Sequence, residues 1–454
     1  MKLLTVIFTA AILLPGQPAP PAVMNIAQAV ETALRNYPSI RVTQEQMNAA
    51  AAAIRLAQTA YLPHVDGLLQ VNRATRNTYY GLLLPQSIVP GVDGVKADNL
   101  GTVFDSGAGV LVSWQPFDFG LRRANVAVAE AARDQAQAAL KKTRHEISVA
   151  AADAFLTVVA ARQTAEAARA AVDSWQILQR SIHALVNAQL RPGADESRVL
   201  AELAGAQTQV AQAEQAIDVA RATLSEFVGL DPTQLSLNPA KLTEPAPEAP
   251  EPGFDPANNP LAREQTAAIA QQQRRLDALG RIYYPQFLVQ GLAAGRGSGL
   301  ETDGARLGGL NGLVPTTANF GLGLTVTFSA MDRFALHEQE AMQSANVRAQ
   351  EAQYQLIATK LRAQVNAAMA TLAGARRVAL STPVEVASAR TAVEQATARF
   401  QSGLAPIDDV AQARRLLVQA QIDDALARLN VWRARLQVAA VRGDIQPFLD
   451  EIVR

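Results

Sequence analysis

The spacing of hydrophobic residues switches between two periods along the chain, in the same order in each half. Residues 39–61 are alanine-rich and place apolar side chains three and four positions apart, which predicts a helix. From 64 to 73 the pattern alternates, with Val65, Leu69 and Val71 on one face, which predicts a strand. The same reasoning predicts strands at about 63–75 and 108–117, and again at about 285–297 and 319–329.

The two halves share short motifs at a nearly constant spacing. Tyr61-Leu62-Pro63 recurs 222 positions later as Tyr283-Tyr284-Pro285, and Asp195 recurs 214 positions later as Asp409. Because the second offset persists over more than a hundred residues, it indicates two structural repeats. We therefore expect a first repeat at 23–237, a proline-rich linker without a packed core at 238–257, a second repeat at 258–445 and a C-terminal tail at 446–454.

Each predicted strand has the length that a tilted membrane-crossing strand needs, with one apolar and one more polar face. Aromatic residues are scarce, yet they gather where strands meet helices, as the aromatic girdle of a membrane barrel does. A half-buried sheet in a water-soluble protein would show the same alternation. Four strands cannot close a barrel, so a membrane barrel would require several chains. The girdle candidates are Tyr61, Trp114, Phe117, Tyr283, Tyr284 and Phe328, with Phe119 and Phe334 beside them.

Long helical stretches follow the second strand of each half, at about 120–187 and 334–401. At 1.5 Å per residue, such a stretch extends about 100 Å. Each stretch ends in a turn, and the chain returns as a second helix at about 194–228 or 407–441. Taken alone, these segments also fit an ordinary coiled coil.

Composition narrows the classes of function. The chain has 41 basic and 41 acidic residues and no cysteine, which argues against a nucleic-acid-binding protein and excludes disulfides and thiolate sites. No clustered acid, base or metal-ligand motif stands out, so we expect neither an enzyme nor a bound cofactor or metal. Lys2 and the apolar run from Leu3 to Leu14 predict a secretory signal peptide over 1–22.

Several motifs together resemble the TolC-like outer-membrane efflux protein family. The opening Asn25-Ile26-Ala27-Gln28-Ala29-Val30 resembles the start of that family, and Leu62-Pro63 resembles its helix-to-strand junction. Phe117-Asp118-Phe119-Gly120 is similar to its strand-to-helix junction. Residues 398–404, Ala-Arg-Phe-Gln-Ser-Gly-Leu, resemble the helical tip that adaptor proteins engage.

The resemblance implies an α+β membrane protein: a homotrimer whose 12-stranded β-barrel, with four strands from each chain, continues into a long periplasmic α-helical barrel. Such a protein lies in the outer membrane of a Gram-negative bacterium, in contact with its lipid, and most of the chain is periplasmic. It serves as a passive exit duct for small molecules, together with a periplasmic adaptor and an RND or ABC transporter of the inner membrane. Two alternatives stay open: the outer-membrane component of type I protein secretion, and a periplasmic coiled-coil scaffold.

The resemblance also implies roles for residues at the two tips. Asp195 and Asp409 match carboxylates that line the pore entrance, although an aspartate there also suits a helix N-terminus. Gln189 stands where the family usually has glycine, so we expect the first turn to shift to Pro192-Gly193. Phe400 and Ala405 replace a phenol and a basic residue that close the entrance in some members. The expected adaptor-docking residues are Leu190, Pro192, Gly193, Gly403, Leu404 and Pro406.

Overall fold

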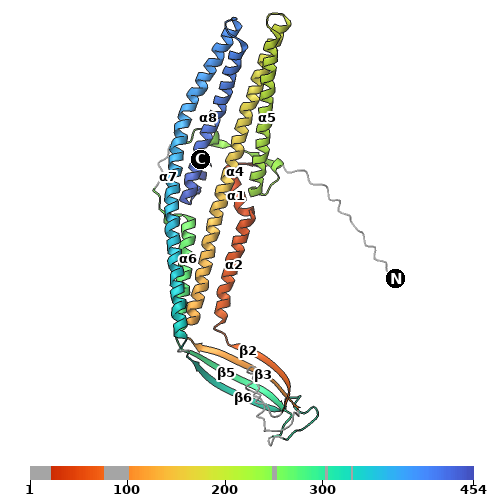
Figure 1. The fold of residues 1–454 in the computed structure, drawn as a ribbon, viewed down its shortest axis with the longest axis vertical. Coiled ribbons are helices and arrows are strands. Elements are labelled where there is room, and N and C mark those ends of the chain that lie inside the picture. Colours follow the sequence, from red (N-terminus) through yellow and green to blue (C-terminus); the bar gives the residue numbers. More distant parts are fainter. Residues whose placement is uncertain (1–21, 76–101, 248–252, 302–304, 329–330, 454) are drawn as a thin grey trace, which may run out of the picture. The chain divides into compact units, whose positions relative to one another are not determined.

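The structure is a computed structural model that describes residues 22–75, 102–247, 253–301, 305–328 and 331–453 (Figure 1). It divides into two compact units. Met1–Gln44, Ala138–Arg263 and Gln355–Arg454 form the first, which we call the helical unit. Glu45–Gln137 and Glu264–Tyr354 form the second, which we call the sheet unit. Each unit takes segments from both sequence halves, so the units cut across the two predicted repeats.

The predicted long helices are confirmed as α4, Leu121–Asn187, and α7, Asp332–Gln401. α4 is 67 residues long and rich in alanine, the residue with the highest helix propensity. In the helical unit α5 runs back along α4, and α8 runs back along α7 (Figure 1). The other helices are α1 Ile26–Asn36, α2 Pro38–Thr59, α5 Gly193–Val228, α6 Pro260–Leu279, α8 Ile407–Arg442 and α9 Gln446–Val453.

The returning helices α5 and α8 begin and end at equivalent positions. Both are 36 residues long, and each begins directly after a proline, Pro192 or Pro406. Each ends at a glycine in the left-handed region, Gly229 with φ 74° and Gly443 with φ 87°, which is the usual conformation of a helix C-cap. The 214-residue offset therefore marks the same local structure twice.

The four predicted strands form one antiparallel sheet in the order β2-β3-β5-β6 (Figure 1). β3 begins six residues earlier than the alternation predicted, at Thr102 instead of 108. Pairing explains the difference, because β2 continues to Thr75 and Thr75 lies opposite Thr102. The strands are β2 His64–Thr75, β3 Thr102–Phe117, β5 Gln286–Ser298 and β6 Thr317–Thr327.

The helical unit has a continuous hydrophobic core where residues distant in sequence meet. Phe155 and Leu156 of α4 and Trp432 of α8 are at most 1% exposed in this core. A short parallel pair, β1 Ala22–Met24 with β4 Leu235–Leu237, adjoins it. This core belongs to a single chain, so the helical unit does not depend on a partner to bury these side chains.

The prediction that the proline-rich linker lacks a packed core is wrong for its described residues. Leu242 is 1% exposed within the core of the helical unit. The indole Nε1 of Trp432 donates a hydrogen bond to the Glu244 carbonyl at 3.1 Å, and Arg435 donates one to the Pro247 carbonyl at 3.1 Å. Side chains of α8 thus satisfy backbone acceptors that a proline-rich segment cannot pair by itself.

The expected C-terminal tail is the helix α9. Phe448, Leu449 and Ile452 recur at helical spacing and are all buried in the same core. Glu451 pairs with the buried guanidinium of Arg435 at 2.5 Å. The predicted tail is therefore an integral part of the helical unit.

Some expectations concern residues outside the described ranges. The predicted signal peptide, except Ala22, and the loop between β2 and β3 are among them. In the ranges that the structure does describe, no helix is both long and apolar enough to span a lipid bilayer.

Candidate functional site

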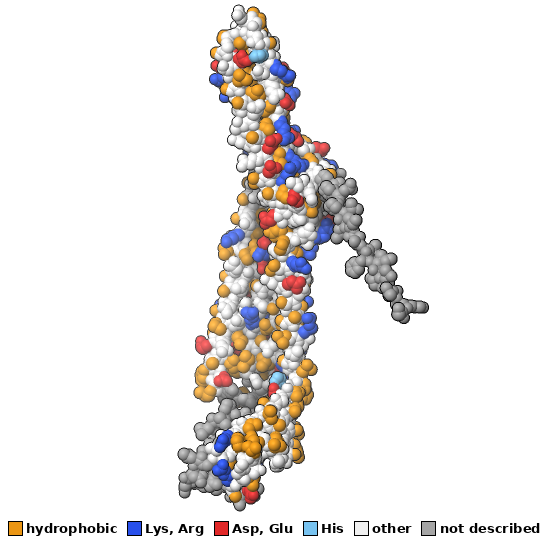
Figure 2. All heavy atoms as spheres, turned by 90° about the vertical axis from the view of Figure 1, so that its right-hand side faces the viewer, with side chains coloured by type: hydrophobic (Ala, Val, Ile, Leu, Met, Phe, Trp, Pro, Cys, Tyr) orange, Lys and Arg blue, Asp and Glu red, His pale blue; other side chains and the backbone are white. Residues whose placement is uncertain are grey.

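One face of the sheet is an apolar surface that is exposed on β2, β3 and β6 and partly exposed on β5. Val65, Val112, Gly291 and Leu322 lie opposite one another across all four strands. On β6 the exposed fraction is 84% for Leu322 and 94% for Phe320. Figure 2 shows hydrophobic side chains gathered over the strands of the sheet unit. An apolar patch of this kind marks a surface that contacts another protein or a lipid phase.

The opposite face of the sheet is more polar. The imidazole Nε2 of His64 lies 3.0 Å from a carboxylate oxygen of Asp66, and Gln115 donates a hydrogen bond to Gln286 at 3.1 Å. This face is not purely polar, because it also carries leucines such as Leu111, which lies opposite Asp66. The contrast between the faces follows the period of two in the sequence.

The outer strands β2 and β6 are the edges of the sheet. Each pairs along one side only, and among the described residues no strand covers its other side. A long edge leaves a row of backbone N–H and C=O groups available for pairing with another chain.

Four aromatic rings cluster where the central strands meet the helices. Phe119 stacks on Tyr284 with ring centroids 5.0 Å apart, and Phe117 meets Phe119 edge-on at 4.6 Å. Phe287 lies 6.3 Å from Phe117, on the apolar face of β5. Phe119 has φ 51°, a conformation that a bulky residue rarely adopts. The strained turn is what directs its ring onto Tyr284.

The other predicted girdle residues lie at the same strand–helix junctions. Trp114 donates a hydrogen bond from Nε1 to the Tyr61 carbonyl at 3.1 Å. Tyr283 donates one to the Arg333 carbonyl at 3.3 Å. Phe328 and Phe334 are 63% and 73% exposed. These residues all lie near the strand–helix junctions, and their role as a membrane girdle stays a prediction.

Asp118 anchors the start of α4. Its carboxylate accepts hydrogen bonds from the backbone N–H groups of Gly120 and Arg122 and pairs with the Arg122 guanidinium at 2.8 Å. Burial of Asp118 opposes its ionisation, but the hydrogen bonds and the ion pair outweigh that effect and hold its pKa below the ordinary value. The Arg122 guanidinium also lies over the ring of Tyr61, 4.7 Å from the centroid.

The two tips have the same backbone, which corrects the expectation of a shifted turn. Gln189 adopts φ 60°, close to the 74° of Gly403 in the other repeat. The N–H of Leu190 donates to the Leu185 carbonyl at 2.9 Å, and that of Leu404 donates to the equivalent Arg399 carbonyl at 2.8 Å. A glutamine thus occupies a position that favours glycine, and the turn stays in register.

The predicted docking residues are accessible at both tips. Leu190 is 70% exposed and Leu404 is 73% exposed, although both are large and apolar. Exposed leucines at equivalent turns favour a binding surface over a purely structural role. The remaining docking candidates are also exposed: Pro192, Gly193, Gly403 and Pro406.

Arginines hold the two tips together, which sequence reasoning missed. The Arg191 guanidinium donates a hydrogen bond to the Phe400 carbonyl at 2.6 Å and lies over its ring at 4.2 Å from the centroid. Arg198 pairs with Asp408 at 3.3 Å. Phe400 is only 4% exposed, so its ring serves as the platform for a cation–π contact.

A small hydrophobic core lies beneath these contacts. Trp175, Val199 and Val410 are buried in it, from α4, α5 and α8 respectively. Arg414 lies over the Trp175 ring at 5.9 Å and donates to the Ser174 carbonyl at 2.9 Å, and burial lowers its pKa. The tips therefore form one packed body.

Asp195 and Asp409 occupy the first turns of α5 and α8. Asp195 is partly exposed and Asp409 is exposed, and neither has an ion-pair partner among the described residues. A carboxylate at this position is stabilised by the helix dipole. The role of these two residues at a pore entrance stays a prediction.

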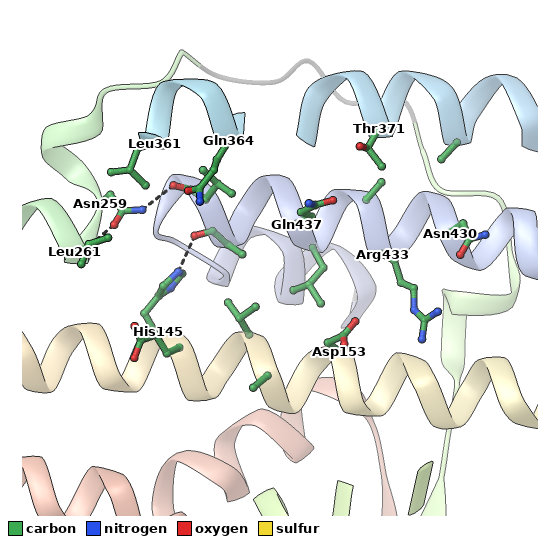
Figure 3. A pocket seen from close by; sticks show the side chains of 18 of the residues that line it. His145, Asp153, Asn259, Leu261, Leu361, Gln364, Thr371, Asn430, Arg433 and Gln437 are labelled. Carbon is green, nitrogen blue, oxygen red and sulfur yellow. Dashed lines mark hydrogen bonds between the residues drawn. The ribbon is translucent and has the colours of Figure 1, made fainter. Parts of the chain in front are cut away.

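The helical unit also contains a cavity of about 860 Å³ between α4, α7 and α8. Figure 3 shows His145 and Asp153 extending from α4, with Leu361 and Gln364 of α7 on the opposite side. The imidazole Nε2 of His145 lies 2.8 Å from the Ala440 carbonyl, so this ring ties α4 to α8. Across the described ranges, no three metal-ligating side chains are grouped.

Comparison with known proteins gives one family and one set of structures. The sequence profile of the "Outer membrane efflux protein" family matches residues 29–230 and 256–444. Protein CyaE of Bordetella pertussis (strain Tohama I) is 28% identical over 224 residues, which is 48% of this chain and 43% of CyaE. The alignment thus spans less than half the length of that relative.

Two solved structures show the same fold. The outer-membrane channel OprN has a TM-score of 0.74 and 18% identity, and the match covers 92% of this chain and 89% of OprN. The Campylobacter jejuni CmeC outer membrane channel has a TM-score of 0.72 and 14% identity, with coverage of 98% and 93%. At such identities the likeness establishes the fold alone.

Proposed function

Because this chain belongs to the outer membrane efflux protein family, we propose that it is a passive exit duct of a tripartite efflux system. In this role it conducts small molecules from the periplasm to the exterior and performs no catalysis itself. The observation that carries the proposal is a combination of two features. The sheet has an exposed apolar face and two open edges, and the helical tips carry exposed leucines.

The sheet acts in this proposal as one third of a homotrimeric, 12-stranded barrel. A backbone edge exposed to lipid costs several kcal/mol per unpaired group, so β6 of one chain pairs with β2 of the next. The apolar face contacts lipid, and the more polar face lines the lumen. The aromatic residues at the strand–helix junctions form the periplasmic girdle.

The tips form the periplasmic entrance, and their arginine contacts keep it closed. Asp195 and Asp409 contribute a ring of carboxylates, which favours cations. Arg191 holds the second tip through Phe400, where it replaces the tyrosine-based closure expected from the family. The exposed leucines dock a periplasmic adaptor, which connects the duct to an RND or ABC transporter of the inner membrane.

Conductance in planar lipid bilayers tests this proposal. We expect the purified protein to form discrete, low-conductance channels. Trivalent cations should block these channels from the side on which the tips lie, and the Asp195→Asn/Asp409→Asn variant should lose most of that block. Absence of any conductance from correctly folded trimers would contradict the proposed duct.

A second test addresses closure. Arg191→Ala removes both the hydrogen bond to the Phe400 carbonyl and the cation–π contact, so we expect a higher single-channel conductance. Arg180→Ala is a matched control, because this arginine lies on α4 and forms no ion pair among the described residues. Equal conductance of Arg191→Ala and wild type would show that this contact does not hold the entrance.

Adaptor docking is tested by cross-linking in cells. We expect Leu190→Ser/Leu404→Ser to reduce cross-linking to the adaptor severalfold while trimers still assemble, because the substitutions remove only exposed side chains. Normal cross-linking and normal efflux in this variant would show that the tips are not the docking surface.

A further inference from the structure

A hollow of about 760 Å³ lies between α4 and α6, where these helices meet the two central strands of the sheet, β3 and β5. Arg123 and Ala124 of α4 line one side, and Arg274 and Asp277 of α6 line the other. The stacked rings of Phe119 and Tyr284 form the wall nearest to the strands. Gly120 also lines the hollow, and a Cβ atom added to it would meet no other atom within 4 Å.

The hollow carries excess positive charge. Of its three arginines, Arg274 is paired with Asp277 at 3.4 Å. Arg123 and Arg281 have no ion-pair partner among the described residues, and both are exposed. A carboxylate oxygen of Glu340 lies 3.7 Å from where a Cβ on Gly280 would stand, so this acidic group borders the hollow without being one of its lining residues. Two guanidinium groups are therefore available to an anion.

The hollow continues the apolar face of the sheet. Phe287 lies opposite Val326 of β6, on the face that also presents Leu322 and Phe320. The ring centroid of Phe287 lies 6.2 Å from that of Phe119, and Arg123 and Arg281 line the same hollow as Phe119. Apolar side chains, aromatic rings and cations therefore succeed one another in the order of the layers of a leaflet: acyl chains, glycerol region and phosphate.

The position of the hollow keeps it clear of neighbouring chains. It lies where β3 and β5 meet their helices, and these are the two inner strands of the sheet. Neighbouring subunits of a barrel would pair with the outer strands β2 and β6. A ligand in the hollow is consequently bound by one chain, with three equivalent sites in a trimer.

We propose that this hollow binds the phosphodiester headgroup of a glycerophospholipid from the periplasmic leaflet of the outer membrane. Arg123 and Arg281 hold the phosphate through charge-assisted hydrogen bonds, and the Phe119–Tyr284 stack supports the glycerol and the first methylenes. The positive φ of Phe119 strains the backbone, and this strained turn positions the ring that supports the bound lipid. This inference rests on the proposed function, because that proposal directs the apolar face toward lipid.

Native mass spectrometry of the full-length trimer with phosphatidylglycerol tests the proposal. We expect wild type to retain about one tightly bound lipid per chain. Each substitution, Arg123→Gln or Arg281→Gln, should weaken retention about fivefold, and the double variant about 25-fold. Arg275→Gln is the matched control, since Arg275 is an exposed neighbour of Arg274 on α6 that does not line the hollow.

Three outcomes would overturn the proposal. The first is equal lipid retention by wild type and the double variant, and the second is an equal loss of retention in the Arg275→Gln control. The third is displacement by excess inorganic phosphate of all bound lipid, which would indicate a site for a free anion. Planar-bilayer conductance separates this proposal from the duct itself: conducting trimers without selective lipid retention contradict the lipid site only.

Discussion

The helical unit and the sheet unit treat apolar side chains in opposite ways. In the helical unit Phe155 and Trp432 are at most 1% exposed within a core that one chain completes. In the sheet unit Phe320 is 94% exposed, and no described strand of the same chain pairs with the edges of the sheet. One chain therefore completes the core of the first unit. In the proposed barrel, the apolar face and the edges of the second unit are covered by lipid and by neighbouring copies.

Removing a core side chain should affect the helical unit most. Trp432→Ala deletes a ring that is 1% exposed, together with its hydrogen bond to the Glu244 carbonyl. We expect a loss of about 3–5 kcal/mol in the free energy of unfolding, visible as a much lower helical melting temperature by circular dichroism. Phe320→Ala is the contrasting control and should change that temperature little. Similar effects of the two substitutions would remove the contrast between the units.

A charge on the lipid-facing side of the sheet should prevent assembly. Leu324→Arg places a guanidinium on the apolar face of β6, where a charge facing lipid costs up to about 2–4 kcal/mol per chain, depending on its depth. Thr325→Arg, one residue later, places the same charge on the other face and should be tolerated. The yield of heat-modifiable trimers in outer-membrane fractions measures both. Equal yields would show that the faces are assigned incorrectly.

The Asp118–Arg122 pair should make the strand–helix junction sensitive to acid. Because the pKa of Asp118 is lowered in the folded state, its stabilising contribution is complete above the unfolded value of about 4 and is lost as the pH falls through the folded value. Asp118→Asn should lower the thermal midpoint at pH 7, and its difference from wild type should shrink below about pH 4. A difference that is independent of pH would contradict this account.

The smallest expected effect concerns the two tips. Gln189 has φ 60° without the freedom of glycine, so Gln189→Gly should stabilise the first tip by up to about 1 kcal/mol. The reciprocal change, Gly403→Ala at φ 74°, should destabilise the second tip by a similar amount. Local hydrogen exchange at the two turns measures both. Destabilisation by Gln189→Gly, or stabilisation by Gly403→Ala, would indicate that the two turns are not equivalent.

Features that depend on local periodicity or on the repeat could be predicted from the sequence. The alternation located the four strands, and the offset of 214 positioned the ends of α5 and α8. The shared φ of Gln189 and Gly403 agrees with this offset, although the substitution of glutamine for glycine suggested a shifted turn. Repeat position was therefore a better guide than residue preference at this turn.

The sequence could not predict features that depend on contacts between distant residues. β1 and β4 have three residues each, too few to show a period, and they pair across more than two hundred positions. Leu242 is buried within a proline-rich segment because this segment packs against helices α8 and α9. The contact of Arg191 with Phe400 joins two tips 209 positions apart, so neither residue alone signals it.

The number of chains in the outer-membrane particle tests the central claim most directly. Electron cryomicroscopy of the protein extracted from the outer membrane into lipid nanodiscs would determine that number and the pairing of the sheet edges. We expect three chains in one closed barrel, with β6 of each chain hydrogen-bonded to β2 of the next. A single chain per particle, or chains whose β2 and β6 edges remain unpaired, would contradict it.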